Sequence, residues 1–166
     1  MAVKVFVSWS GDKSFQLAER LVEWLPTIVP SVRVFYSSDI GGGYLWLNKL
    51  LQELTDAEYG IVCVSKENQQ SQWLHFEVGA LWQRAGKDIP VCPLLLDLPT
   101  KDLKGPLAFF QAREFNEQGL RSMCAEIAKK AGLDDLQFRR NFKAAWAQIE
   151  TELGGNHPRR RRKHST

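Results

Sequence analysis

The 166-residue chain has few cysteines and histidines, and this scarcity excludes several kinds of site. Its three cysteines, Cys63, Cys92 and Cys124, are an odd number without a C-x-x-C pair, which fits reduced thiols in a cytosol. Two of the three histidines lie in the last ten residues, and no H-E-x-x-H motif occurs. We therefore expect a cytoplasmic protein with no disulfide framework and no metal site.

Long hydrophobic runs and nucleotide fingerprints are also missing. No apolar run approaches the roughly 18 residues that cross a bilayer, so we expect no membrane span and no membrane partner. The start, MAVKVFVSW, enters a strand-like run without a basic region or a cleavage site, so we expect no signal peptide. Neither G-x-G-x-x-G nor a Walker loop occurs, so a Rossmann-type dinucleotide fold is not indicated.

The net charge of +3 comes from the end of the chain. The last twelve residues hold five Lys and Arg and no acid, and without these five the 22 basic residues become 17, against 19 acidic ones. We therefore expect a slightly acidic domain over residues 1–153 and a disordered basic tail over 154–166. Nucleic acid is not expected as a partner of the domain, although Arg159 to Lys163 leave weak, salt-dependent binding as an alternative.

Five strand-like runs alternate with helical patterns, which predicts an α/β fold with a parallel sheet and helices on both faces. The predicted strands span residues 3–9, 32–36, 60–65, 89–96 and 111–115. The predicted helices span residues 14–25, 45–57, 73–84, 117–131 and 136–153. We expect Ser14 to cap the first helix and Pro26 to stop it. Right-handed crossovers favour the flavodoxin-like strand order 2-1-3-4-5.

A glutamate near the carboxyl ends of the strands is the first candidate for catalysis, because ligands of such folds bind at that edge. Glu77 lies in the predicted helix after the third strand, one turn beyond Trp73. It either faces the crevice or is a solvated acid near a helix N-terminus. Trp146 and Glu150 repeat the spacing in the last helix, where we interpret them as packing and a solvated acid.

Two further segments lie at the same predicted edge. Ser38 and Asp39 precede three glycines and Trp46, and the backbone amides of such a loop either approach a phosphate or form a simple turn. Trp9 ends the first predicted strand. Its ring, like that of Trp46, serves either as a core anchor or as a stacking surface for a ligand.

Three blocks of sequence, taken together, resemble the Toll/interleukin-1 receptor (TIR) domain of the bacterial type. The first is VFVSWS, the second is VFYSSDI-x-x-G-x-x-W, and the third is IVCVSKEN followed by WLHFEVGAL. Their order and spacing are kept over roughly residues 3–115. The resemblance implies the flavodoxin-like fold that the strand pattern also predicts.

The resemblance also implies an activity. Enzymatic TIR domains cleave NAD+ at the nicotinamide–ribose bond, and their catalytic glutamate ends a W-x-x-x-E motif, which here places it at Glu77 and opens the motif at Trp73. NAD+ is then the substrate, and no separate cofactor is expected. Residues of the first loop and of the second loop, called the BB loop, match substrate-lining positions: Trp9, Ser10, Ser38 and Asp39. Trp9 and Trp46 offer rings that can stack on nicotinamide or adenine.

The chemistry of NAD+ cleavage requires few catalytic groups. Nicotinamide leaves from a cationic ring nitrogen and departs neutral, so no general acid is needed. One carboxylate beside the ribose can stabilise the oxocarbenium-like transition state. Capture by water gives ADP-ribose, and internal capture gives a cyclic ADP-ribose. The sequence does not distinguish between these products.

Two other functions fit the same residues. One is a non-enzymatic TIR module, because the BB loop also serves assembly with other TIR domains and with further protein partners. The other is a nucleoside deoxyribosyltransferase-like enzyme, which also uses a glutamate near the crevice. NAD+ cleavage in bacterial defence signalling or NAD+ depletion, with self-association of the domain, is the function that the resemblance favours.

Overall fold

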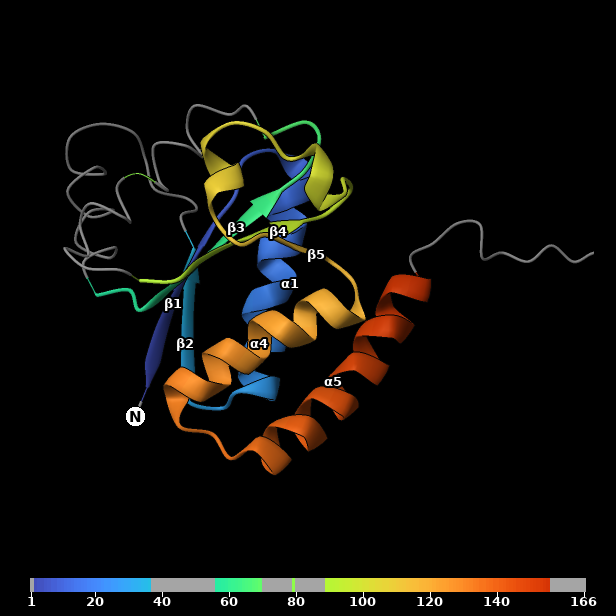
Figure 1. Cartoon of the computed structure of the whole chain (residues 1–166). Coiled ribbons are helices and arrows are strands. Elements are labelled where there is room, and N and C mark those ends of the chain that lie inside the picture. Colours follow the sequence, from blue (N-terminus) through green and yellow to red (C-terminus); the bar gives the residue numbers. More distant parts are fainter. Residues whose placement is uncertain (1, 37–55, 70–78, 80–88, 156–166) are drawn as a thin grey trace, which may run out of the picture.

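The computed structural model of the chain describes residues 2–36, 56–69, 79 and 89–155. One sheet of five parallel strands forms its centre, in the order β2-β1-β3-β4-β5 (Figure 1). The strands are β1 (Val3–Ser8), β2 (Val32–Tyr36), β3 (Tyr59–Val64), β4 (Val91–Leu95) and β5 (Arg113–Glu114). This arrangement confirms the predicted flavodoxin-like fold class and strand order. β5 is shorter than its predicted range.

Both faces of the central strands are buried. All six residues of β3 are buried, as are five of the six in β1. Successive side chains of a strand point to opposite faces, so Val5 and Val7 join one hydrophobic cluster and Phe6 joins another. Burial on both faces explains why these strands are continuous hydrophobic runs in the sequence.

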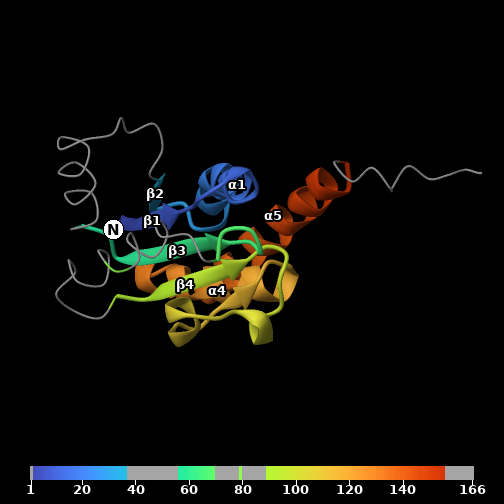
Figure 2. The same ribbon diagram turned by 90° about the horizontal axis from the view of Figure 1, so that it is seen from above.

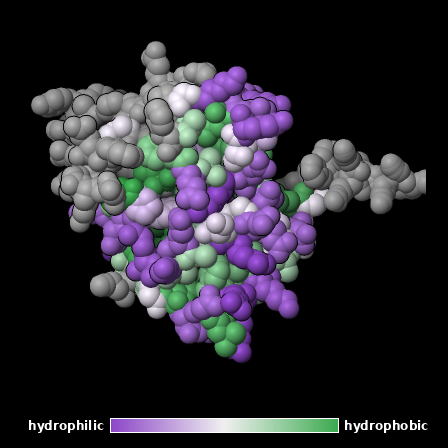
Figure 3. Space-filling model, viewed as in Figure 1, coloured by the Kyte–Doolittle hydropathy of each residue, from purple (hydrophilic) through white to green (hydrophobic). Residues whose placement is uncertain are grey.

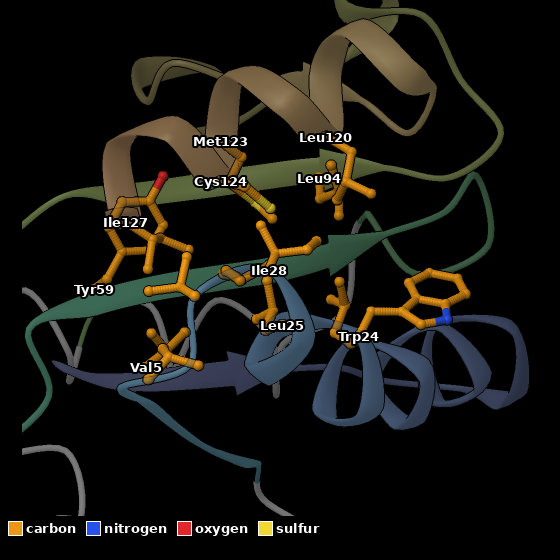
Figure 4. Packing of buried hydrophobic residues seen from close by; sticks show 14 of the residues in the cluster. Val5, Trp24, Leu25, Ile28, Tyr59, Leu94, Leu120, Met123, Cys124 and Ile127 are labelled. Atoms are coloured by element: carbon orange, nitrogen blue, oxygen red, sulfur yellow. The ribbon is translucent and has the colours of Figure 1, made fainter. Parts of the chain in front are cut away.

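Helices of the described part of the chain cover one face of the sheet, as two views at right angles show (Figures 1 and 2). They are α1 (Asp12–Ile28), α4 (Glu117–Ala131) and α5 (Asp135–Gly155). Figure 4 shows Ile28 of α1 and Ile127 of α4 among the core side chains on this face, close to Tyr59 of β3. On the opposite face, the segment with the short helices η1 (Thr100–Asp102) and η2 (Pro106–Phe109) contributes buried leucines to the second cluster.

The first helix differs from its predicted bounds at both ends. It begins at Asp12, two residues before Ser14, and Gly11 precedes it without a side-chain cap. Ser14 is buried inside the helix, where its hydroxyl bonds to backbone rather than capping. The helix also continues past Pro26 to Ile28. A proline near the last turn removes only one helical hydrogen bond, and the full burial of Leu25 and Ile28 outweighs that loss.

The helix after β5 matches its predicted bounds. Asn116 caps α4 by accepting a hydrogen bond from the amide of Gly119, and Gly132 ends it in the left-handed conformation. The predicted last helix is confirmed as α5, which is two residues longer at its C-terminal end. The predicted helices at 45–57 and 73–84 lie almost entirely outside the described residues, as does the basic tail beyond Gly155, so these stay predictions.

Candidate functional site

The loops that follow β1, β3 and β4 lie at one edge of the sheet, because parallel strands have their carboxyl ends together. They comprise Trp9–Gly11 after β1, Ser65–Gln69 after β3, and residues from Leu96 onward after β4. Several polar side chains in these loops bond from one loop to another. This edge is therefore the described part of the predicted ligand site.

Asn68 is the central polar residue of this edge. It is 4% exposed, and its carboxamide is almost fully used. Its Nδ2 donates to the carbonyl of Ser10 at 2.8 Å and to that of Cys63 at 3.0 Å, and its Oδ1 accepts from the amide of Ser65 at 2.7 Å. Asn68 therefore joins the loop after β3 to the loop after β1.

The hydroxyl of Ser14, on the first turns of α1, holds Ser10 from the other side. It donates to the carbonyl of Ser10 at 2.8 Å and accepts from the amide of Ser10 at 2.8 Å. It also lies 3.2 Å from the carbonyl of Gly11. Both backbone polar groups of Ser10 are thus engaged by side chains from other elements.

A carboxylate ties the loop after β4 into the same edge. Asp97 accepts a hydrogen bond from the amide of Lys66 at 2.7 Å, and its other oxygen lies 3.3 Å from the ammonium of Lys13. The side chain of Lys13 is 54% exposed, so this ion pair is screened and contributes little stability. The backbone bond to Lys66 fixes the spacing of the loops after β3 and β4.

Trp9 packs on one side and is only half-buried. Its ring lies 4.7 Å from that of Phe15 on α1, and Phe15 in turn stacks on Tyr36 at 6.0 Å. The indole N–H of Trp9 is buried and has no hydrogen-bond partner among the residues that the structure describes. Trp9 therefore anchors the loop after β1 to α1, and a stacking role toward a ligand stays a prediction.

The sequence matches the family model described as the TIR domain over residues 5–124. The chain belongs to the TIR domain family. Among solved structures, this TIR domain is similar to the TIR domains of the activated Roq1 resistosome that directly recognizes the pathogen effector XopQ. The two are 16% identical over 86% of this chain and 82% of that chain, with a TM-score of 0.47. A comparison with curated proteins finds no match.

The structure places only part of the predicted site of this TIR domain. Trp9 and Ser10 lie together at the carboxyl edge, as predicted. The remaining predicted site residues lie outside the described residues: Ser38, Asp39, Trp46, Trp73 and Glu77. Asn68 and Asp97 each follow a predicted strand, but no sequence pattern assigns a role to either side chain.

The second W-x-x-x-E pair of the TIR domain lies on α5. Trp146 stacks on Phe142 with ring centroids 6.2 Å apart and packs against the core, whereas Glu150 is exposed. The indole N–H of Trp146 is buried and lacks a hydrogen-bond partner within the described ranges. This geometry agrees with the interpretation of the pair as packing and a solvated acid.

The thiols of the TIR domain do not form a reactive site. Cys63, Cys92 and Cys124 are all free and buried. Burial raises the pKa of each thiol, so all three stay protonated and unreactive at neutral pH. Within the described ranges, no group of three His, Cys, Asp or Glu side chains could hold a metal ion. None of the helices found there is long and apolar enough to cross a membrane.

Two grooves on the described surface border α5. One, of about 790 Å³, runs between α1 and α5 and includes Tyr36 and the acidic residues Glu19, Glu23 and Glu152. The other, of about 730 Å³, runs between α4 and α5 over an aromatic floor with charged residues of both signs around it. Figure 3 shows mainly hydrophilic side chains over α4 and α5, with small hydrophobic areas between them.

Proposed function

We propose that this TIR domain cleaves NAD+ at the nicotinamide–ribose bond, with Glu77 as the catalytic carboxylate. The observation that carries the proposal is membership of the TIR family combined with a W-x-x-x-E motif, from Trp73 to Glu77, in the segment after β3. The strand order supports it, because it brings the loops after β1 and β3 to one edge. The proposed substrate-lining residues are Trp9, Ser10, Ser38, Asp39 and Trp46.

The reaction needs charge stabilisation rather than a pair of acids. The bond to the cationic ring nitrogen breaks with both electrons going to nicotinamide, which leaves neutral, and positive charge develops on the ribose. The carboxylate of Glu77 stabilises that charge and can accept a proton from the attacking water. NAD+ and water then give nicotinamide, ADP-ribose and a proton. Capture by a group of the substrate itself gives a cyclic ADP-ribose instead.

The proposal includes a biological setting. We place the reaction in the cytoplasm, where the three free thiols stay reduced, and in defence signalling or NAD+ depletion. Self-association through TIR–TIR contacts accompanies it, and further protein partners are compatible with it. The tail has no part in the proposed reaction.

The test is product analysis by chromatography after incubation with NAD+, at high protein concentration. Wild type is compared with Glu77→Gln and with the matched control Glu150→Gln, which removes the same charge from the second motif on α5. We expect Glu77→Gln to lower nicotinamide release by about 10²–10³, the usual effect of losing one electrostatic stabiliser, and Glu150→Gln to stay near wild type.

Four outcomes would contradict the proposal. Turnover of Glu77→Gln above about a tenth of wild type removes Glu77 from the chemistry, since loss of an electrostatic stabiliser costs more than that. Equal losses in the two variants show that the site is misplaced. No nicotinamide from wild type points to an assembly module, and cleavage of deoxynucleosides in place of NAD+ points to a deoxyribosyltransferase-like enzyme.

A further inference from the structure

We infer that Asn68 is a positioning residue of the NAD+ site, which holds the substrate-lining loop after β1 in register with the loop after β3. This inference rests on the proposed function. Asn68 acts through Ser10, whose carbonyl accepts the hydrogen bond from the Nδ2 of Asn68.

The first argument is the reach of the side chain. The backbone of Asn68 belongs to the turn after β3, where its amide bonds to the carbonyl of Ser65 at 3.2 Å. If Asn68 only shaped this turn, the hydrogen bond that its Oδ1 accepts from the amide of Ser65 would be sufficient. Its Nδ2 instead bonds to Ser10, 58 residues away in the chain. The carboxamide thus connects the loop after β3 to the loop after β1.

The second argument is chemical specificity. The side chain at position 68 donates two hydrogen bonds, to the carbonyls of Ser10 and Cys63, and accepts one from the amide of Ser65. Asparagine supplies both donors and the acceptor in one small side chain. Aspartate has the same shape but no donor, so it would place a negative oxygen against the carbonyls of Ser10 and Cys63. Because Asn68 is nearly fully buried, water cannot replace the lost hydrogen bonds.

The third argument is that Ser10 is held from two sides. Asn68 holds its carbonyl from the β3 side, and the hydroxyl of Ser14 holds both its amide and its carbonyl from the α1 side. Backbone at a ligand site binds its ligand well only when it is held close to the productive geometry. Two independent contacts on one residue of a loop provide that rigidity.

The decisive experiment compares Asn68→Asp with Asn141→Asp. Asn141 is the control, because its Nδ2 also donates to a backbone carbonyl, that of Ile28 at 3.0 Å, at the opposite end of α1 from the loop after β1. The KM and kcat for NAD+ are measured at a temperature where thermal unfolding shows each variant to be folded. We expect Asn68→Asp to raise KM about tenfold with kcat within about threefold of wild type, and Asn141→Asp to change neither.

A second variant covers the case in which Asn68→Asp does not fold. Ser14→Ala removes the other contact on Ser10 and leaves a smaller disturbance, so it is expected to raise KM in the same way. Hydrogen exchange of the Ser10 amide is expected to accelerate in both variants and not in Asn141→Asp. The double variant, with both Asn68→Asp and Ser14→Ala, should raise KM by less than the product of the two single effects, because both changes act on Ser10.

The outcomes separate this inference from the proposed function. Wild type that releases no nicotinamide overturns both. If wild type and Asn141→Asp cleave NAD+ and the folded Asn68 and Ser14 variants have wild-type KM, the proposed function stands and the positioning role is wrong. The positioning role is also wrong if the Asn68 and Asn141 variants lose NAD+ cleavage only in proportion to their loss of thermal stability. A residue with a purely structural role would give that pattern.

Discussion

Tyr59 at the start of β3 donates its phenolic hydrogen to Glu126 of α4 at 2.8 Å, across the interface between the sheet and the helix. Glu126 in turn lies 2.8 Å from the guanidinium of Arg113, the first residue of β5, and Arg113 reaches the thiol of Cys92 at 3.4 Å. This network connects β3, β4 and β5 to α4. It joins the strands at the less extensively paired side of the sheet, where β5 has only two residues.

The hydroxyl of Tyr59 gives the first prediction. Tyr59→Phe leaves the fully buried ring in place and removes one hydrogen bond to a charged group, so we expect a loss of about 1–2 kcal/mol in the free energy of unfolding. Urea denaturation measures it. Tyr36→Phe is the control, because the hydroxyl of Tyr36 has no hydrogen bond to any described residue, and its loss should change stability by less than about 0.5 kcal/mol. Equal effects in the two variants would show that the bond to Glu126 contributes nothing.

The three buried thiols predict a loss of stability in alkaline solution. Burial raises the pKa of Cys63 and Cys124 above the value of about 8.5 that a thiol has in an unfolded chain. For Cys92, burial again dominates, although the nearby Arg113 opposes it. As pH rises above about 8.5, the unfolded chain loses thiol protons that the folded chain keeps. Stability is therefore full below that pH and falls above it, by up to about 1.4 kcal/mol per pH unit for each thiol.

Urea denaturation in reducing buffer at several values between pH 7.5 and 10 tests this dependence. Cys63→Ala costs stability at every pH by creating a cavity, so the informative quantity is the slope against pH. We expect this variant to show a shallower fall of stability with pH than the wild type, because one of the buried thiols no longer titrates. A slope that does not change would mean that the thiols do not control the alkaline limit.

The sequence predicts most of the fold for local reasons. Runs of β-branched and large apolar residues identify strands that are buried on both faces, and Asn116 and Gly132 mark the ends of α4. The start of α1 was missed, because Ser14 has the side chain of a cap but uses it to hold Ser10. Its end was missed because burial of Ile28 outweighs the effect of a proline.

The sequence could locate only those site residues that directly follow a predicted strand. Trp9 and Ser10 follow a predicted strand, and the structure places them at the carboxyl edge. The contacts that hold this edge together escape sequence reasoning, because they join residues far apart in the chain. Asn68 and Ser10 are separated by 58 residues, and Lys66 and Asp97 by 31. No local pattern indicates that such side chains meet.

The last prediction concerns activation by assembly. The segment after β2 contains Gly41, Gly42 and Gly43 and resembles the BB loop through which TIR domains contact one another. If assembly stabilises the active form of the site, activity per molecule rises with protein concentration, because association shifts the population toward that form. Head-to-tail contacts use two different surfaces and need not close, so open arrays rather than two-fold dimers are expected.

Introducing a bulky charge into this segment tests the idea. Gly42→Arg should reduce both the mass of the assemblies measured by light scattering and the nicotinamide released per molecule. Gln118→Arg adds the same charge at an exposed position on α4 and should change neither. Assembly and turnover must fall together, because a loss of turnover in a variant that still assembles would place Gly42 in substrate binding instead. Specific activity that stays constant from nanomolar to high micromolar protein, with a monomer throughout, would show that this TIR domain acts without assembly.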